Sequence, residues 1–164
     1  MVNEAVSNTG PIIHLTEINF TKAFNIFNSI TTTPEVLSEL IKNETTLPKK
    51  IKIINIKAEW KDKVKVLTNQ YNLGLGEASA LTLAMQEKTD YFLTDDLEAR
   101  AIAGKYNIET HGTIGIILRA FRDKIIDKGG AIEKIGEIKT ISSLFITQDL
   151  IDEIINSINT FKQD

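Results

Sequence analysis

The sequence predicts an α/β fold in which a central, mostly parallel sheet of four to five strands lies between two layers of helices. Short β-like runs alternate with longer helix-like runs, the pattern of consecutive βαβ units. A chain of 164 residues with 42% hydrophobic side chains is long enough to bury one core. We therefore expect a single domain over residues 1–164, with a helical tail from about residue 129.

Five short apolar runs are the candidate strands. The run at 51–56 is the most strand-like, because isoleucines dominate it. Most of these runs are followed by a helix start signal, as a parallel sheet requires. The predicted strands are residues 4–7, 29–32, 51–56, 91–94 and 108–110.

The helices are predicted from apolar spacing and from their start signals. Thr33 is a plausible N-cap and Pro34 a plausible first residue for the helix within TPEVLSELI. The pair Gly129-Gly130 is interpreted as a turn before the helical tail. The other predicted helices are 60–71, 76–88, one after residues 95–96, one within 112–126, and tail segments around 132–135 and 148–158.

Composition excludes several classes of protein. The 19 basic and 22 acidic residues give a net charge of −3, so no overall positive field favours nucleic acid. The absence of cysteine excludes disulfides and thiolate-bound zinc, and it fits a reducing cytoplasm. The start MVNEAVSNTG has no signal-peptide pattern, and no window is long and apolar enough for a membrane span. A soluble, cytoplasmic protein without a membrane partner is expected.

Polar residues follow the predicted strands where ligands of parallel sheets usually bind. Asn8 comes directly after the first strand, and Asp95 and Asp96 come after the fourth. Because the carboxyl ends of parallel strands share one edge of the sheet, these side chains are expected there. Glu77 begins the helix that leads into the fourth strand, and Glu39 lies on the helix after the second.

These oxygen donors suit Mg²⁺ or Mn²⁺, hard ions that prefer carboxylate, carbonyl and water ligands. Each residue alone also has an ordinary structural interpretation. Glu77 near a helix N-terminus is favoured by the helix dipole, and Asp95 or Asp96 is a common N-cap. Glu39 stands on a helix face that points either to the sheet edge or to water. Only the group as a whole indicates a metal site.

The chain resembles the PIN-domain family, named after the PilT N-terminus, in its branch of short prokaryotic proteins related to toxin ribonucleases. The similar blocks occur in family order and cover nearly the whole chain. They are VSNTGPIIHL, TPEVLSEL, GLGEASALTLA, FLTDDLEAR, GTIGIILRA and the tail SSLFITQDLIDEII.

The resemblance implies that Glu39, Glu77 and Asp96 hold one or two Mg²⁺ or Mn²⁺ ions. Asp96 is favoured because the family often places this acid two positions after the threonine of the strand, here Thr94, and Asp95 is the adjacent candidate. Asn8 is a departure, since most active members carry aspartate there. An amide still offers an oxygen ligand but brings no charge, so metal binding should weaken.

The function implied by the resemblance is metal-dependent hydrolysis of RNA by a toxin-like ribonuclease of a toxin–antitoxin system. A small antitoxin and a homodimer are the implied protein partners. The alternative is a catalytically degenerate module that binds RNA or protein, because of Asn8. Thr9 is a supporting candidate that either orients a ligand or stabilises the turn before Gly10-Pro11. Ser79 is a second departure, since many relatives repeat the glutamate there.

Neither histidine is assigned a catalytic role. His14 lies in an apolar helical run, IIHL, where a structural histidine is expected. No G-x-S-x-G nucleophile motif and no phosphate-binding P-loop is present. Arg100, Arg119 and Arg122 either contact phosphate or lie on solvated helix faces.

Overall fold

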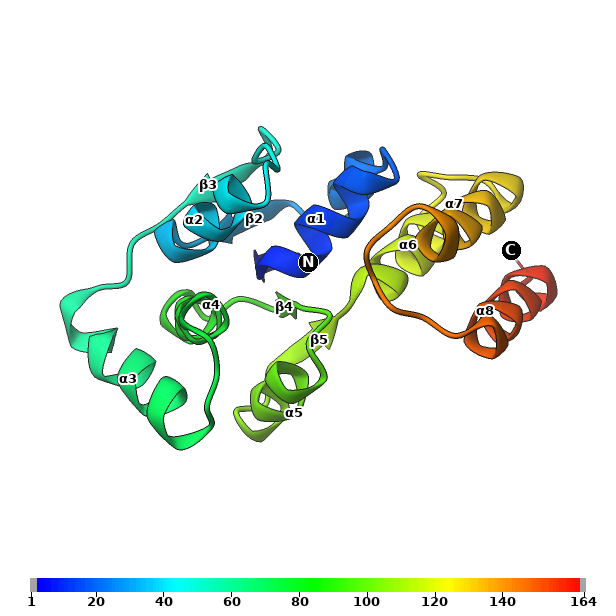
Figure 1. Cartoon of the computed structure of the whole chain (residues 1–164). Coiled ribbons are helices and arrows are strands. Elements are labelled where there is room, and N and C mark those ends of the chain that lie inside the picture. The colour runs from blue at the N-terminus through cyan, green and yellow to red at the C-terminus, as the bar shows by residue number, and fades with distance from the viewer. Residues whose placement is uncertain (1–2, 163–164) are drawn as a thin grey trace.

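A computed structural model of the protein describes residues 3–162. Five parallel strands form the sheet in the order β3-β2-β1-β4-β5, so β1 is central and β3 and β5 are the edges (Figure 1). Register pairs Val6 of β1 with Thr31 of β2 and with Phe92 of β4. The strands are β1 (Glu4–Ser7), β2 (Ser29–Thr32), β3 (Ile51–Ile53), β4 (Tyr91–Leu93) and β5 (Glu109–His111).

The helices connect the strands and extend beyond the last one. In Figure 1, α7 and α8 gather at one end of the molecule and α3 lies at the other. The first half of the chain contributes α1 (Thr9–Glu17), η1 (Thr21–Ile26), α2 (Pro34–Lys42), η2 (Ala58–Trp60) and α3 (Lys61–Gln70). The second half contributes α4 (Leu75–Glu87), α5 (Leu97–Lys105), α6 (Thr113–Arg122), α7 (Lys128–Thr140) and α8 (Gln148–Thr160).

The predicted three-layer α/β/α arrangement is confirmed. The α4 helix packs against β1 and β4 and also touches α2, α3 and α5, while α1, η1 and α6 pack on one another. Because neighbours surround α4, its residues 78–84 are all buried. No helix among the described residues is long and apolar enough to span a membrane.

The third strand is shorter than predicted. It ends at Ile53, whereas the apolar run continues to Ile56. Among the described strands it pairs with β2 alone, and β2 ends at Thr32 because Thr33 and Pro34 begin α2. One further hydrogen bond runs from the Ile54 N–H to the Thr32 carbonyl (2.9 Å). Past that point, the described part of the chain offers no strand with which residues 54–56 could pair.

The start of α2 was predicted correctly, whereas the prediction of a turn at Gly129-Gly130 was wrong. Thr33 caps α2 as expected, accepting a hydrogen bond from the Val36 N–H at 3.2 Å. Gly129 and Gly130 do not form a turn but lie in the first turn of α7. Asp127 caps this helix by accepting a hydrogen bond from the Gly130 N–H at 2.7 Å. An N-cap of this kind stabilises a helix start and so opposes the poor helix propensity of glycine.

Candidate metal centre

Asn8 joins the end of β1 to the start of α1, at the carboxyl edge of the sheet. It occupies the N-cap position of α1, yet its side chain makes no capping hydrogen bond. Instead Nδ2 donates to Thr94 Oγ1 at 3.4 Å, while the backbone N–H of Asn8 donates to the Leu93 carbonyl. The amide oxygen, Oδ1, is buried and has no hydrogen-bond partner within the described part of the chain. An unpaired buried oxygen of this kind is costly unless a ligand pairs with it.

Glu39 is turned toward the sheet edge and not toward solvent, which decides the facing that the sequence left open. Its Oε2 accepts a short hydrogen bond from the Thr9 hydroxyl, so Thr9 orients this carboxylate. The same carboxylate lies over Gly76, where even a methyl group would overlap it. Glycine at position 76 therefore leaves room for the Glu39 carboxylate in this position.

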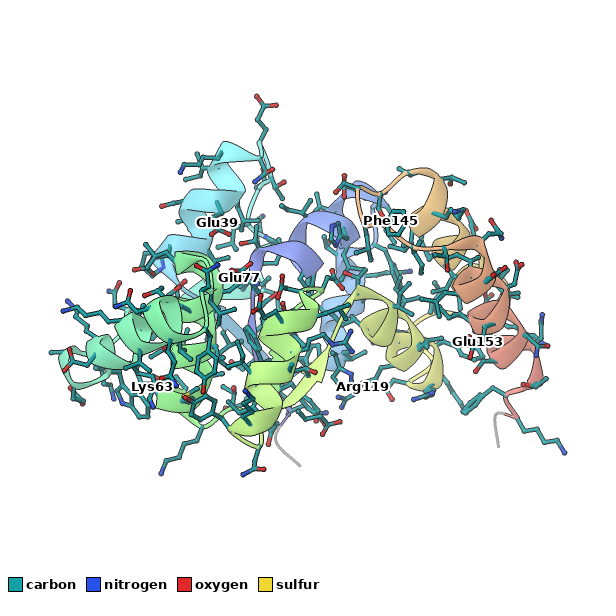
Figure 2. All side chains as sticks on the ribbon, turned by 60° about the horizontal axis from the view of Figure 1, so that its bottom comes forward. Glu39, Lys63, Glu77, Arg119, Phe145 and Glu153 are labelled. Carbon is teal, nitrogen blue, oxygen red and sulfur yellow. The ribbon has the colours of Figure 1, made fainter. Side chains whose placement is uncertain are left out.

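Glu77 lies in the first turn of α4, beside Glu39 in Figure 2. Its Oε2 accepts a hydrogen bond from the Gly74 N–H at 2.7 Å. Burial raises the pKa of the Glu77 carboxyl above its ordinary value, although the bond from Gly74 opposes this. The negative charges of Asp96, Glu39 and Glu98 raise that pKa further. Three carboxylates thus lie within electrostatic reach of Glu77, and a bound cation would relieve their repulsion.

The aspartate pair after β4 divides into two different roles. Asp96 is exposed and forms the N-cap of α5, with Oδ1 accepting from the Ala99 N–H at 2.7 Å. Its backbone N–H donates to Thr94 Oγ1 at 3.2 Å. Thr94 Oγ1 therefore contacts both the Asn8 side chain and the backbone N–H of Asp96.

Asp95 points the other way and is held inside the protein. Its Oδ1 accepts from the Thr113 N–H at 2.7 Å, and its Oδ2 accepts from the Thr113 hydroxyl at 2.5 Å. Its Oδ2 also lies 2.7 Å from His14 Nδ1. Burial acts to raise the pKa of Asp95, but these hydrogen bonds from His14 and Thr113 outweigh it and lower the pKa below its ordinary value. Both oxygens are thus occupied by protein donors.

The ligand atoms at this site are of the type that a hard divalent ion prefers, although they are not already arranged as a coordination sphere. Glu39, Glu77, Asp96 and the unpaired Asn8 oxygen offer only oxygen ligands. Within residues 3–162, no three histidine, aspartate or glutamate side chains are already arranged around a common point as metal ligands. Protein donors engage only Oε2 of Glu39 and Oε2 of Glu77, and no hydrogen bond among the described residues uses the Oε1 atom of either carboxylate.

Sequence reasoning missed the residues that support the acids from a distance. Thr113 lies 18 positions beyond Asp95, and Gly76 lies far from Glu39 in the chain. Neither residue type signals such a role. Ser79, the second departure from the family pattern, is buried and bonds to the Gly76 carbonyl and the Thr33 hydroxyl, so it faces the protein interior. Arg119 packs its guanidinium over the Tyr91 ring, at 4.8 Å from the centroid, and has a structural role.

These features define an α/β protein with acidic side chains at the carboxyl edge of a parallel sheet. Residues 4–160 match the family DUF3368, described as a PIN domain, and the chain belongs to the PIN-domain family. This fold is typically that of a nuclease, and its members generally use divalent metal ions.

Solved structures include a chain of similar fold. A PilT N-terminus domain protein from the hyperthermophilic archaeon Sulfolobus solfataricus P2 matches with a TM-score of 0.55 and 14% sequence identity. The match covers 71% of this chain and 92% of that chain. At this identity the likeness concerns the fold alone. A comparison with curated proteins finds no match.

Proposed function

We propose that the protein is a metal-dependent endoribonuclease of PIN type, acting as the toxin-like ribonuclease of a toxin–antitoxin system. The observation that carries this proposal is the group formed by Glu39, Glu77 and Asp96 with the unpaired oxygen of Asn8. These four residues would hold Mg²⁺ or Mn²⁺. A bound ion of this kind activates water and neutralises charge on a phosphodiester.

The side chains themselves have distinct tasks in this proposal. Thr9 holds the Glu39 carboxylate in place through its hydroxyl, and Thr94 positions both Asn8 and Asp96. Glu77 must lose its proton to act as a ligand, and its raised pKa makes that loss depend on pH. Activity should therefore decline on the acid side, where Glu77 becomes protonated.

The decisive test is cleavage of a labelled mixed-sequence RNA by the purified protein with Mn²⁺, with Mg²⁺ and with chelator. We expect cleavage that needs the metal, and faster cleavage by Asn8→Asp because a carboxylate binds a hard cation more tightly than an amide. Asn8→Asp should also be less stable than wild type in chelator by about 1 kcal/mol, since it buries another negative charge, and should regain that stability with Mn²⁺.

The possible results separate the candidate functions. An Asp96→Asn protein purified in parallel controls for contaminating nuclease. Cleavage by Asn8→Asp alone would mean that asparagine disarms the site, and the protein would then be the degenerate binding module. If neither wild type nor Asn8→Asp cleaves RNA with Mn²⁺ or with Mg²⁺, the ribonuclease proposal is contradicted.

A second function, binding of a protein partner, is favoured by an exposed apolar patch near the site. Leu97, Phe145 and Leu150 are 77%, 89% and 44% exposed. They line one groove of about 500 Å³ that Asp95 and Arg100 also border. Exposed apolar surface of this kind commonly marks an interface. We propose that this patch contacts a second copy of the chain or a small antitoxin.

Replacement of Phe145 by aspartate is expected to disrupt that interface without disturbing the core, because the side chain is almost fully exposed. If the patch joins two copies, wild type should sediment as a dimer at micromolar concentration and Phe145→Asp as a monomer. Val66→Asp is the matched control, since Val66 is an exposed apolar residue on α3, outside the patch. A wild-type monomer would exclude the homodimer and leave the antitoxin as the candidate, while a Phe145→Asp dimer would exclude the patch as the dimer surface.

A further inference from the structure

A second groove, of about 470 Å³, lies between the start of α2, the segment after β3 and one face of α3. Its size suits a small ligand or one nucleotide. It combines apolar walls with a few polar groups, as ligand sites do. Its lining includes Glu35, Asn55, Lys61, Val64, Lys65 and Leu75.

Glu35 gives this groove an unsatisfied hydrogen-bond acceptor. Its Oε2 is shielded from solvent and has no hydrogen-bond partner in the described chain. Lys61 and Lys65 border the same groove, yet neither forms an ion pair with Glu35. A buried carboxylate oxygen without a donor is costly, and an ionised carboxylate can only accept hydrogen bonds. Rotation of the Glu35 side chain would turn this oxygen into the groove that the residue lines, where a ligand that brings N–H donors would satisfy it.

Two lysines of this groove are placed where they could bind an anion. Lys61, Val64 and Lys65 follow helical spacing, so they share the face of α3 that lines the groove. Lys63, between them in sequence, instead lies over the Tyr106 ring. The groove thus offers two lysine ammonium groups that form no ion pair within residues 3–162, beside an apolar wall that includes Leu75, which is 57% exposed. This combination suits the phosphate and the flat base of a nucleotide.

The groove opens directly beside the candidate metal centre. Glu35 and Glu39 are one helical turn apart on α2, a rise of about 5.4 Å. On the other wall, Leu75 precedes Gly76, which touches the Glu39 carboxylate, and Glu77 follows. A nucleotide held in the groove would therefore lie next to the acids.

We infer that this groove binds a guanine of single-stranded RNA next to the phosphodiester at the acidic site, with Glu35 as the residue that selects the base. This inference rests on the proposed ribonuclease function and specifies its substrate. The Watson–Crick edge of guanine presents two adjacent N–H donors that a carboxylate accepts in a bidentate manner. Adenine and cytosine offer only an exocyclic amine there, and uracil flanks its N–H with two acceptors that a carboxylate repels.

The test measures binding in chelator, where a metal-dependent enzyme leaves RNA intact. Fluorescence anisotropy compares a uridine octamer containing one central guanine with the same octamer containing one central adenine. We expect wild type to prefer the guanine octamer by about tenfold or more. Glu35→Gln should lose most of this preference, because glutamine replaces one acceptor by an amine. Glu133→Gln, an exposed substitution on α7, is the matched control and should retain it.

A second variant separates the base from the phosphate. Lys61→Ala with Lys65→Ala should weaken binding of both octamers alike and reduce the salt dependence of binding, while the guanine preference remains. Equal binding of the two octamers by wild type would overturn the inference, as would a guanine preference that survives Glu35→Gln. Failure of the ribonuclease proposal has a different result, namely no cleavage with Mn²⁺ while guanine-selective binding in chelator persists.

Discussion

Asp96→Asn is expected to lower metal-dependent RNA cleavage about 100-fold or more while leaving the fold intact. Asparagine caps a helix as well as aspartate does, so its amide oxygen can still accept from the Ala99 N–H and α5 should begin normally. The substitution removes one negative charge from the group that surrounds Glu77. Loss of a charged ligand costs at least as much as the tenfold to 100-fold typical of a supporting residue.

Two measurements test this expectation together. The cleavage rate with saturating Mn²⁺ measures the effect of losing the metal ligand. Urea unfolding measures whether the N-cap of α5 still stabilises the protein. The free energy of unfolding should stay within about 1 kcal/mol of wild type in chelator. A cleavage rate within twofold of wild type would exclude Asp96 as a ligand. A large loss of stability would leave any loss of activity without a specific cause.

Asp95→Ala, unlike Asp96→Asn, is expected to act mainly on stability, lowering the free energy of unfolding by about 3 kcal/mol. The substitution leaves the Thr113 N–H, the Thr113 hydroxyl and His14 Nδ1 without their shared acceptor. These groups join α1, the end of β4 and the start of α6, so their loss weakens contacts between distant parts of the chain. Urea unfolding at neutral pH measures the effect. Asp152→Ala is the control, because Asp152 is exposed on α8 and its loss should cost less than about 0.5 kcal/mol.

The stability that Asp95 contributes should depend on pH in a defined direction. Its pKa is lowered in the folded protein, so the unfolded chain takes up the proton first as pH falls. The contribution is complete above the ordinary aspartate pKa of about 4 and is lost as pH falls through the lower folded value. The difference between wild type and Asp95→Ala should therefore shrink below about pH 4. A difference that grows on acidification would contradict the ionised, hydrogen-bonded state of Asp95.

Local signals in the sequence predicted most of the fold because they act within a few residues. Thr33 and Pro34 specify the start of α2 through a cap and a fixed backbone angle, and no distant contact is needed. The five strands were found as apolar runs between helix signals. The predictions were wrong where another segment of the chain determines where an element ends or begins. The end of β3 depends on where β2 ends, and Gly129-Gly130 joined a helix because Asp127 caps it.

For the candidate site, the sequence by itself determined which residue types reach the carboxyl edge, since parallel topology places Asn8 and the Asp95–Asp96 pair there. Local sequence patterns did not distinguish the two aspartates, because both follow Thr94 and both suit an N-cap, and only the family resemblance favoured Asp96. Only the tertiary structure decided that Asp95 faces inward, through His14 and Thr113, which lie 81 and 18 positions away in the chain. Side-chain direction at a strand end depends on such distant donors, and local spacing contains no information about them.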